Sequence, residues 1–354
     1  MTDKKWMIYG AYGYTGALVV EEAVKRGHRP VLAGRSREKL APIAEKFALE
    51  SRILNLNDHE VLTRALEDVD LVFHAAGPYV HTSAPMVDAC LKSKTHYLDV
   101  TGETSVFEHT LSLDEKAKAA EVALISGTGF DVVPSDCLAN YVAKKVENPT
   151  HLELGVAALN GLSPGTTKTA LEHMHQGAFI RRNGKLENIK MGSDVRQIRY
   201  NDRERLCTAN TWGDLVTAHA STGIPSITVY MAFPKKQIEQ MRRFGGLGQK
   251  LLAITPIRRL AQKWVEKNVY GPNAKIRETA RCHLWAKVWN ENGDSAEAWL
   301  ETMEAYQLTA VASLLSIEKV LTGGIIGAIT PAQAFGANFV MEIAGTKRMD
   351  ELAE

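Results

Sequence analysis

The 354-residue chain contains little cysteine, and neither sign of charge is in excess. The four cysteines lie far apart and form no C-x-x-C pair, which argues against a disulfide framework and a zinc site; they are Cys90, Cys137, Cys207 and Cys282. Lysine and arginine number 42 against 41 acidic residues, a net charge of +1. Because no surplus of basic side chains is available to neutralise phosphates, the composition argues against a general nucleic-acid-binding protein.

Long hydrophobic runs are also scarce. The first ten residues, "MTDKKWMIYG", pass from charges into an apolar segment that is too short for a signal sequence. The most apolar later stretch, residues 310–329, contains Glu318, Lys319 and a Gly-Gly pair, so it predicts a packed helix rather than a membrane span. These features predict a cytoplasmic protein.

A glycine-rich turn follows the first apolar segment, in "KWMIYGAYGYTG". The apolar run from Trp6 to Tyr9 predicts a buried strand, and the residues after Gly16 have helical spacing. A strand-to-helix turn without β-carbons lets a phosphate approach backbone N–H groups and the helix N-terminus. The turn therefore predicts a dinucleotide-binding loop, with contacts from Gly10, Tyr12, Gly13, Tyr14, Thr15 and Gly16.

Strand and helix patterns alternate through the first third of the chain. Six apolar segments, each separated from the next by a helical stretch and short connections, predict an α/β, Rossmann-like, doubly wound parallel sheet. The helix after the fourth segment is predicted from Ser83 to Lys92. After Asp131 the pattern changes to alternating or β-rich segments, with "NENGD" as a hairpin signal. We therefore predict a Rossmann domain over 1–131, an inserted mixed or antiparallel α+β domain over 132–302, and C-terminal helices over 303–354 that complete the first domain.

Arginine occupies the end of the second predicted strand, in "GRSREK". An acidic residue there would bind a free ribose 2′-hydroxyl, whereas a guanidinium binds a 2′-phosphate. The sequence therefore predicts NADP(H) rather than NAD. Other predicted cofactor contacts follow the second, third and fourth strands, and the full set outside the glycine turn is Arg35, Ser36, Arg37, Asn55, Leu56, Ala76, Gly77 and Pro78.

Several motifs together resemble the saccharopine dehydrogenase-like reductases. They are "GAYGYTG", "AGRSREKL", "AAGPY", "YLDVTGE", "GFDVVPSDCLA" and the late "TPAQAFG". The resemblance is closest to the short bacterial branch that includes the trans-acting enoyl reductases. It implies a Rossmann domain formed from both ends of the chain, an inserted mixed-sheet domain and nicotinamide-dependent hydride transfer.

The resemblance leaves the acceptor open, because this fold serves C=C and C=N reduction alike. In the true saccharopine enzymes the turn after the sixth strand reads G-x-D-P-G. Here Gly129 and Asp131 match, but Val132 and Val133 precede Pro134, which argues against an amino-acid substrate. We expect an NADP-dependent oxidoreductase that reduces an enoyl or related lipid-like acceptor. The alternatives are an imine or opine-type amino-acid oxidoreductase and a non-catalytic NADP-binding sensor or scaffold.

Reduction also needs a proton or hydrogen-bond donor near the acceptor atom. Tyr79 is the catalytic candidate, because it follows the Gly-Pro turn where the nicotinamide is expected; the competing interpretation is an aromatic that packs over the cofactor. No metal is predicted, since the two histidines in "EHMHQG" point in different directions on a helix. Further candidates for the substrate cleft are Asp99, Glu103, Asp131, Lys168 and His173. Asp99 and Glu103 have a structural alternative, in which they hold a loop and do not orient a substrate.

The segment 235–267 is basic and amphipathic. It holds nine lysines and arginines against two glutamates, with apolar residues interleaved. Such segments dock acidic carrier proteins or lie on anionic membranes, although a solvated helical hairpin has the same pattern. We therefore expect a small-molecule substrate that could be acyl-linked, a carrier-protein or membrane contact through 235–267, and a homodimer formed through the inserted sheet.

Overall fold

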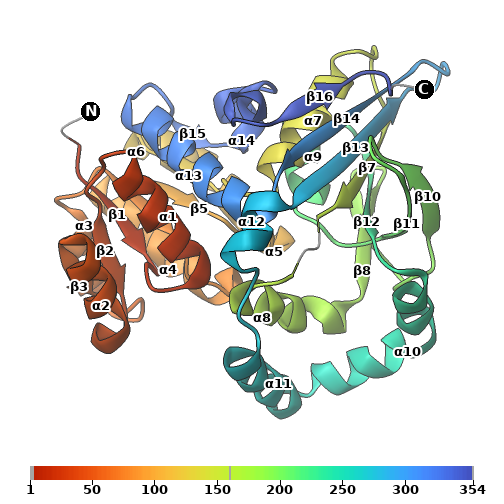
Figure 1. The fold of residues 1–354 in the computed structure, drawn as a ribbon. Helices are drawn as coiled ribbons and strands as arrows, with labels where there is room; N and C mark the ends of the chain where they lie inside the picture. Colours follow the sequence, from red (N-terminus) through yellow and green to blue (C-terminus); the bar gives the residue numbers. More distant parts are fainter. Residues whose placement is uncertain (1–3, 159–160, 353–354) are drawn as a thin grey trace. The chain divides into compact units, whose positions relative to one another are not determined.

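The computed structural model describes residues 4–158 and 161–352, which form two compact units. The first unit comprises residues 1–131 and 306–335, and the second comprises 132–305 and 336–354. In Figure 1 the first unit contains the red and orange elements together with the blue helix α13.

A seven-stranded sheet, entirely parallel, forms the centre of the first unit. Its strand order is β15-β6-β5-β4-β1-β2-β3, so the order reverses between β1 and β4. Open α/β sheets bind ligands beyond the carboxyl ends of the strands at such a reversal. The predicted Rossmann-like sheet is confirmed; its strands are β1 (Trp6–Tyr9), β2 (Val31–Gly34), β3 (Ser51–Ile53), β4 (Leu71–His74), β5 (His96–Asp99), β6 (Ala123–Ile125) and β15 (Gly327–Ala328).

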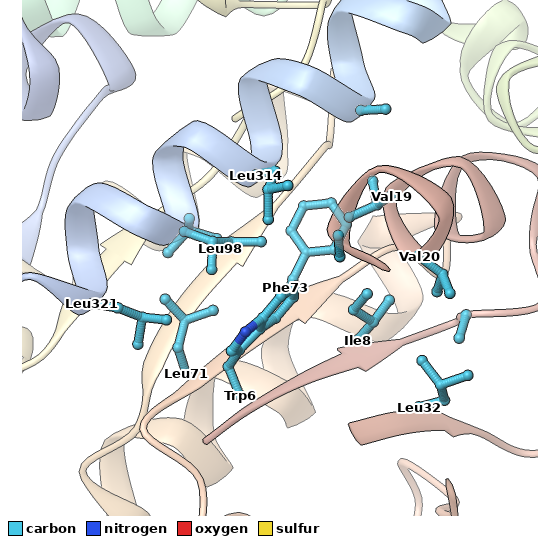
Figure 2. Close-up of a cluster of buried hydrophobic side chains, with 14 of the residues drawn as sticks. Trp6, Ile8, Val19, Val20, Leu32, Leu71, Phe73, Leu98, Leu314 and Leu321 are labelled. Carbon is cyan, nitrogen blue, oxygen red and sulfur yellow. The ribbon is translucent and has the colours of Figure 1, made fainter. Parts of the chain in front are cut away.

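Helices cover both faces of this sheet, because alternate residues of each strand point to opposite faces. Trp6 and Ile8 of β1 lie in one core cluster with α1, α2 and α13, as Figure 2 shows in part. Met7 and Tyr9 lie in the other cluster, with α3, α4 and α6. The helices are α1 (Tyr14–Lys25), α2 (Arg37–Phe47), α3 (His59–Leu66), α4 (Tyr79–Ser93), α5 (Thr104–Leu111), α6 (Asp114–Ala120), α13 (Ala305–Leu321) and α14 (Pro331–Phe335).

The apolar stretch near the C-terminus is part of this core. Leu314, Ile317 and Leu321 of α13 are buried beside Phe73 and Leu98 of the sheet. The helix is therefore packed, as its charged residues predict. In the residues that the structure describes, no helix combines the length and the apolar character that crossing a membrane requires.

The second unit is built on a nine-stranded mixed sheet. Its central strands β7 and β12 are parallel, whereas the other pairings are antiparallel, which agrees with the predicted mixed α+β domain. The "NENGD" turn joins β13 and β14 as a hairpin. The strands are β7 (His151–Ala157), β8 (Ala178–Arg182), β9 (Lys185–Ile189), β10 (Val195–Arg199), β11 (Glu204–Ala209), β12 (Ser226–Ala232), β13 (Arg281–Trp289), β14 (Ser295–Met303) and β16 (Lys347–Met349).

The helical segments of the second unit include the predicted hairpin in the basic segment, formed by α10 and α11. The segments are α7 (Val133–Ala143), α8 (Pro164–His173), η1 (Met174–Gln176), α9 (Asp214–Thr222), α10 (Lys235–Ala253), α11 (Thr255–Asn268), α12 (Ala274–Thr279) and η2 (Phe339–Glu342).

The end of the chain corrects one prediction. The sequence analysis assigned all of 303–354 to the first domain, but residues 336–354 group with the second unit. The reason is β16, which pairs antiparallel with β14 and places Met349 opposite Trp299. A three-residue edge strand is too short to show an alternating apolar pattern, so the sequence carried no signal for it.

Candidate functional site

The glycine turn brings two loops of the first unit into backbone contact. Gly10 follows β1 and has a φ of +88°, a conformation that favours glycine. A Cβ atom at Gly10 would lie 2.9 Å from the carbonyl oxygen of Ala75 and from Cβ of Ala76. These two alanines follow β4, so the loops after β1 and β4 meet at the point where the strand order reverses.

The start of helix α1 is open to an anion. Gly13 donates its N–H to the oxygen of Gly10 at 2.9 Å and forms the N-cap of α1. Among the described residues no side chain caps this helix end, and its first turn, which contains Tyr14, Thr15 and Gly16, has no acidic residue. A pyrophosphate therefore fits this helix start, because the backbone N–H groups of a first helical turn and the helix dipole both favour negative charge.

The end of β2 carries unpaired cationic side chains. Arg35 and Arg37 are exposed, and neither forms an ion pair within residues 4–158 and 161–352. Ser36 lies between them and caps α2 by accepting a hydrogen bond from Lys39 N at 3.4 Å. The ring of Tyr12 covers Gly34, where a Cβ atom would lie 2.5 Å from Tyr12 Cε1.

These arginines, beside an aromatic ring and a helix start, suit a ribose 2′-phosphate. The fit agrees with the prediction of NADP(H). The individual contacts of Tyr12, Arg35, Ser36 and Arg37 with the cofactor stay predictions.

The loop after β3 offers less than the sequence predicted. The Asn55 side chain is exposed, and its Oδ1 accepts a hydrogen bond from Asn57 N at 3.1 Å. Leu56 is buried in the core of the first unit. Leu56 could therefore contact an adenine through its backbone alone. Asn55 could contact the adenine through its side chain.

Tyr79 lies directly after the Gly77–Pro78 turn, as the first residue of α4. Its phenol is buried and donates to the oxygen of His74 at 3.4 Å, and a Cβ atom at Gly77 would lie 3.2 Å from its ring. Burial, with nearby carboxylates, raises the pKa of Tyr79 well above its usual value, so the phenol stays protonated. This geometry matches the packing interpretation more closely than the catalytic one.

Glu103 has a structural contact that explains the start of α4. Its carboxylate accepts hydrogen bonds from the N–H groups of Tyr79 at 2.7 Å and Val80 at 2.9 Å. A buried carboxylate at a helix N-terminus satisfies two backbone donors and complements the helix dipole. The helix therefore begins at Tyr79, whereas the sequence predicted its start at Ser83.

Asp99 joins the ends of β5 and β6. Its side chain is fully buried, and its two oxygens accept four hydrogen bonds of 2.8–3.0 Å, from Tyr97 Oη, Ser126 Oγ, Thr101 N and Gly127 N. Burial raises the pKa of Asp99 to about 6, while the four donors oppose that rise. The side chain is thus committed to holding two loops at the carboxyl edge of the sheet.

Asp131 differs from the other two carboxylates. Its side chain is half-buried, and within the described parts of the chain it has no hydrogen-bond or ion-pair partner. Gly102 lies against it, since a Cβ atom at Gly102 would be 2.8 Å from Asp131 Oδ2. Burial without a compensating partner raises the pKa of Asp131 to about 6. A carboxyl group that titrates near neutral pH is suited to proton transfer or ligand binding.

Helix α13 supports the loop that carries Asp131. Phe130 N donates to Thr309 Oγ1 at 3.0 Å, and Ser313 Oγ donates to the oxygen of Thr128 at 3.2 Å. At the start of the same helix, the ring of Tyr306 lies edge-on to Tyr14, with centroids 5.0 Å apart. Helix α13, far along the chain from both loops, therefore contacts the glycine loop and the Asp131 loop. Local patterns in the first third of the sequence do not indicate these contacts.

Lys168 and His173 belong to helix α8 of the second unit. Lys168 forms an ion pair with Glu266 of α11. Their predicted place in a substrate cleft stays a prediction, and the structure brings together only the candidates of the first unit. His74 was missed by the sequence analysis: it is fully buried at the end of β4, burial lowers its pKa to about 3, and its Nδ1 lies 3.2 Å from Tyr97 Oη.

The fold and the carboxyl-edge loops define the first unit as a dinucleotide-binding α/β domain. Residues 6–125 match the family model of the saccharopine dehydrogenase NADP binding domain. The predicted resemblance is thereby confirmed, and so is NADP(H) as the cofactor type of this domain. The match covers the glycine turn, the Arg35 region and the loops after β4 and β5.

Two groups of relatives and one solved structure extend the comparison. The human saccharopine dehydrogenase-like oxidoreductase is 28% identical over 211 residues, 52% of this chain and 49% of the relative. The chain therefore spans about half the length of that relative. A trans-acting enoyl reductase of Mycobacterium leprae is 24% identical over 414 residues, 93% of each chain. Saccharopine dehydrogenase (L-Glu forming) from Saccharomyces cerevisiae has the same fold, with a TM-score of 0.66, 13% identity and 98% of this chain covered.

Replacing Arg35 tests the cofactor site. We predict that Arg35→Ala weakens NADPH binding by roughly 1.5–3 kcal/mol, because a charge-assisted hydrogen bond to the 2′-phosphate is lost. NADH binding should change little. Calorimetric titration of both cofactors measures the difference, and Arg64→Ala, an exposed arginine of α3, is the control with the same change of charge. An equal loss for NADPH and NADH would contradict the assignment.

Replacing Asp99 tests its structural role. Asp99→Ala should lower the free energy of unfolding by about 2–4 kcal/mol, since buried donors lose their acceptor and a cavity remains. Asp99→Asn should cost less, because the Tyr97 and Ser126 hydroxyls can turn to accept from the amide. Urea unfolding measures both. If Asp131→Ala lowered the free energy of unfolding as much as Asp99→Ala, the hydrogen bonds of Asp99 would not account for its structural role.

Proposed function

We propose that the protein is an NADP-dependent oxidoreductase that reduces an enoyl or related lipid-like acceptor. The NADP-binding domain match and the oxidoreductase relatives support the general activity. The cofactor, when bound, supplies the hydride. The residues of this chain would bind its phosphates at the α1 N-terminus and Arg35, and would hold the proton that reduction also consumes.

Negative charge near Tyr79 carries the proposal for the acceptor. Three carboxylates contribute to the raised pKa of Tyr79: Asp99, Glu103 and Asp131. A substrate carboxylate beside this group would be repelled, and a neutral acyl group would not. The edge of the sheet in the first unit therefore favours an acyl acceptor over an amino acid.

Arginines of the second unit support the same choice. The buried guanidinium of Arg181 donates to the backbone oxygens of Leu215 and, at 2.6 Å, Gly184. Arg182 pairs with Glu187 at 3.0 Å. Both side chains are already committed within the second unit, so they are poor candidates to bind a substrate carboxylate.

We propose Asp131 as the group that holds the transferred proton. Its carboxyl is half-buried and unpartnered in the described residues, and its pKa of about 6 leaves a protonated fraction at neutral pH. The Tyr79 phenol, the candidate from the sequence, is buried and donates to His74 O, so we assign it the packing role.

The homodimer, the cytoplasmic location and the carrier-protein contact remain predictions. Size measurement, localisation and binding assays address them.

Turnover assays test the proposed reaction. We expect NADPH oxidation in the presence of an α,β-unsaturated acyl thioester, with little oxidation when a 2-oxo acid and an amine are supplied instead. The measurement is the loss of NADPH absorbance with product identified by mass spectrometry. Oxidation only with the 2-oxo acid and amine would favour the amino-acid alternative, whereas NADPH binding without turnover of either would favour a sensor or scaffold.

Replacing Asp131 separates its chemical role from a structural one. Asp131→Asn should lower turnover by about 10²–10⁴-fold if the carboxyl supplies the proton. The wild-type rate should fall as pH rises through about 6, where the acid ionises, and the variant should lose that dependence. NADPH affinity should be unchanged. A variant with wild-type turnover and pH profile would exclude this role.

Asp131→Asn should lower turnover but raise the free energy of unfolding at neutral pH. Because the folded-state pKa of Asp131 lies above the unfolded value, the contribution of Asp131 to wild-type stability falls as pH rises from about 4 to about 6. Asp131→Asn avoids that cost, so it should be more stable than the wild type at pH 7 by on the order of 1–2 kcal/mol, with no gain below pH 4. Thermal unfolding at the two pH values checks this, and a destabilised variant at pH 7 would contradict it.

A further inference from the structure

Helices α10 and α11 expose an unusual number of large apolar side chains. Each helix carries three of them at spacing i, i+3 and i+7, which places them along one face; they are Phe244, Leu247 and Leu251 on α10, and Ile257, Leu260 and Trp264 on α11. Leu260 is 71% exposed and Trp264 is 63% exposed. Ile254, which connects the helices, is exposed as well. We call these seven residues the apolar stripe.

Faces other than the apolar stripe attach both helices to the second unit. On α10 the buried residue is Ile238, and on α11 it is Val265. At 100° per residue, Ile238 lies about 145° around α10 from the middle of the stripe, and Val265 lies about 105° around α11 from it. Arg258 and Gln262 of α11 hold Glu172 of α8 at 3.3 and 2.7 Å. These contacts hold the hairpin on the second unit, and the apolar stripe takes no part in them.

Basic side chains flank the apolar stripe. Lys250 of α10 and Lys263 of α11 lie thirteen positions apart, the same offset that relates the apolar residues of the two helices. Of the nine lysines and arginines in 235–267, only Arg258 forms an ion pair within the described parts of the chain. The outer surface of the hairpin is thus both apolar and strongly cationic, without internal neutralisation.

We propose that the α10–α11 hairpin docks on the surface of an anionic lipid bilayer. A helix with an apolar face flanked by lysine and arginine lies in the membrane interface, with its apolar side chains among the acyl chains and its cations at the headgroups. The two aromatic residues suit a position at the membrane interface. Trp is enriched there, and Phe occurs on the apolar face of interfacial helices, which fits Trp264 and Phe244. Neither helix qualifies as a membrane span, so the hairpin lies on the bilayer rather than crossing it.

The charge and the shape of the stripe favour a bilayer over other occupants. A second copy of the chain would bring two cationic surfaces together, at an electrostatic cost. An acidic protein would match the charge, but it would need a groove fitted to apolar rows on two separate helices. A fluid bilayer accepts those rows in any arrangement.

Sedimentation with vesicles tests the proposal without any need for catalysis or cofactor. The full chain should bind vesicles of equimolar phosphatidylcholine and phosphatidylglycerol, and should bind phosphatidylcholine vesicles at least about tenfold more weakly. Added salt should weaken binding to the anionic vesicles. Failure to bind the anionic vesicles overturns the proposal, and leaves the proposed reductase activity untouched.

Paired variants assign the binding to the hairpin. Leu260→Gln with Trp264→Gln should reduce binding to anionic vesicles by about tenfold or more, since two apolar side chains no longer enter the bilayer. The matched control is Val61→Gln with Val195→Gln, two exposed apolar residues elsewhere. Lys250→Glu with Lys263→Glu should reduce binding similarly, and Lys116→Glu with Lys144→Glu, which changes the net charge equally, should not. Equal effects in test and control pairs overturn the proposal.

Fluorescence gives a second readout from a single side chain. Trp264 is the only exposed tryptophan of the six in the chain. Anionic vesicles should therefore shift the tryptophan emission to shorter wavelength, and Trp264→Phe should remove the shift while largely keeping the binding. Light scattering should give the same mass for the wild type and for Leu260→Gln with Trp264→Gln. A smaller mass for that variant would mean that the stripe joins two copies of the chain, and would overturn the membrane assignment.

Discussion

The close approach of two backbone loops at Gly10 is the constraint on which the site depends. The loop after β1 lies so near Ala75 and Ala76 that a single added methyl group would collide with both. Next to this contact, no side chain of the described residues caps the N-terminus of α1. A phosphate can then reach backbone N–H groups that any larger residue would cover. We propose that the cationic end of β2 adds the selectivity for a phosphorylated ribose.

Three carboxylates at the carboxyl edge of the sheet differ in their hydrogen-bond partners, and these partners distinguish their roles. Glu103 caps α4, and Asp99 accepts four hydrogen bonds between β5 and β6. Asp131 has a similar degree of pKa elevation to Asp99 but no such partners in the described residues. Charge that is buried without compensation costs stability, and natural proteins keep such groups where function needs them. The proposed role of Asp131 rests on this contrast.

Local patterns in the sequence predicted much of the first unit. Short apolar runs predicted strands β1 to β6, and the glycine spacing predicted the turn between β1 and α1, because strand burial and tight turns depend on neighbouring residues. Contacts between distant residues escaped prediction. Nothing around Ser83 indicates that Glu103 extends α4 back to Tyr79, and nothing in "TKRM" indicates that β16 pairs with β14. For the same reason the sequence listed Asp99, Glu103 and Asp131 together as candidates for the substrate cleft, whereas their hydrogen-bond partners distinguish them.

We propose that the loop after β1 holds a pyrophosphate while Arg35 holds the 2′-phosphate of the same dinucleotide. Isothermal titration of the unmodified protein with NADPH and with NADH measures this preference. We expect measurable binding of NADPH and clearly weaker binding of NADH. Preference for NADH, or no affinity for either cofactor, would contradict it.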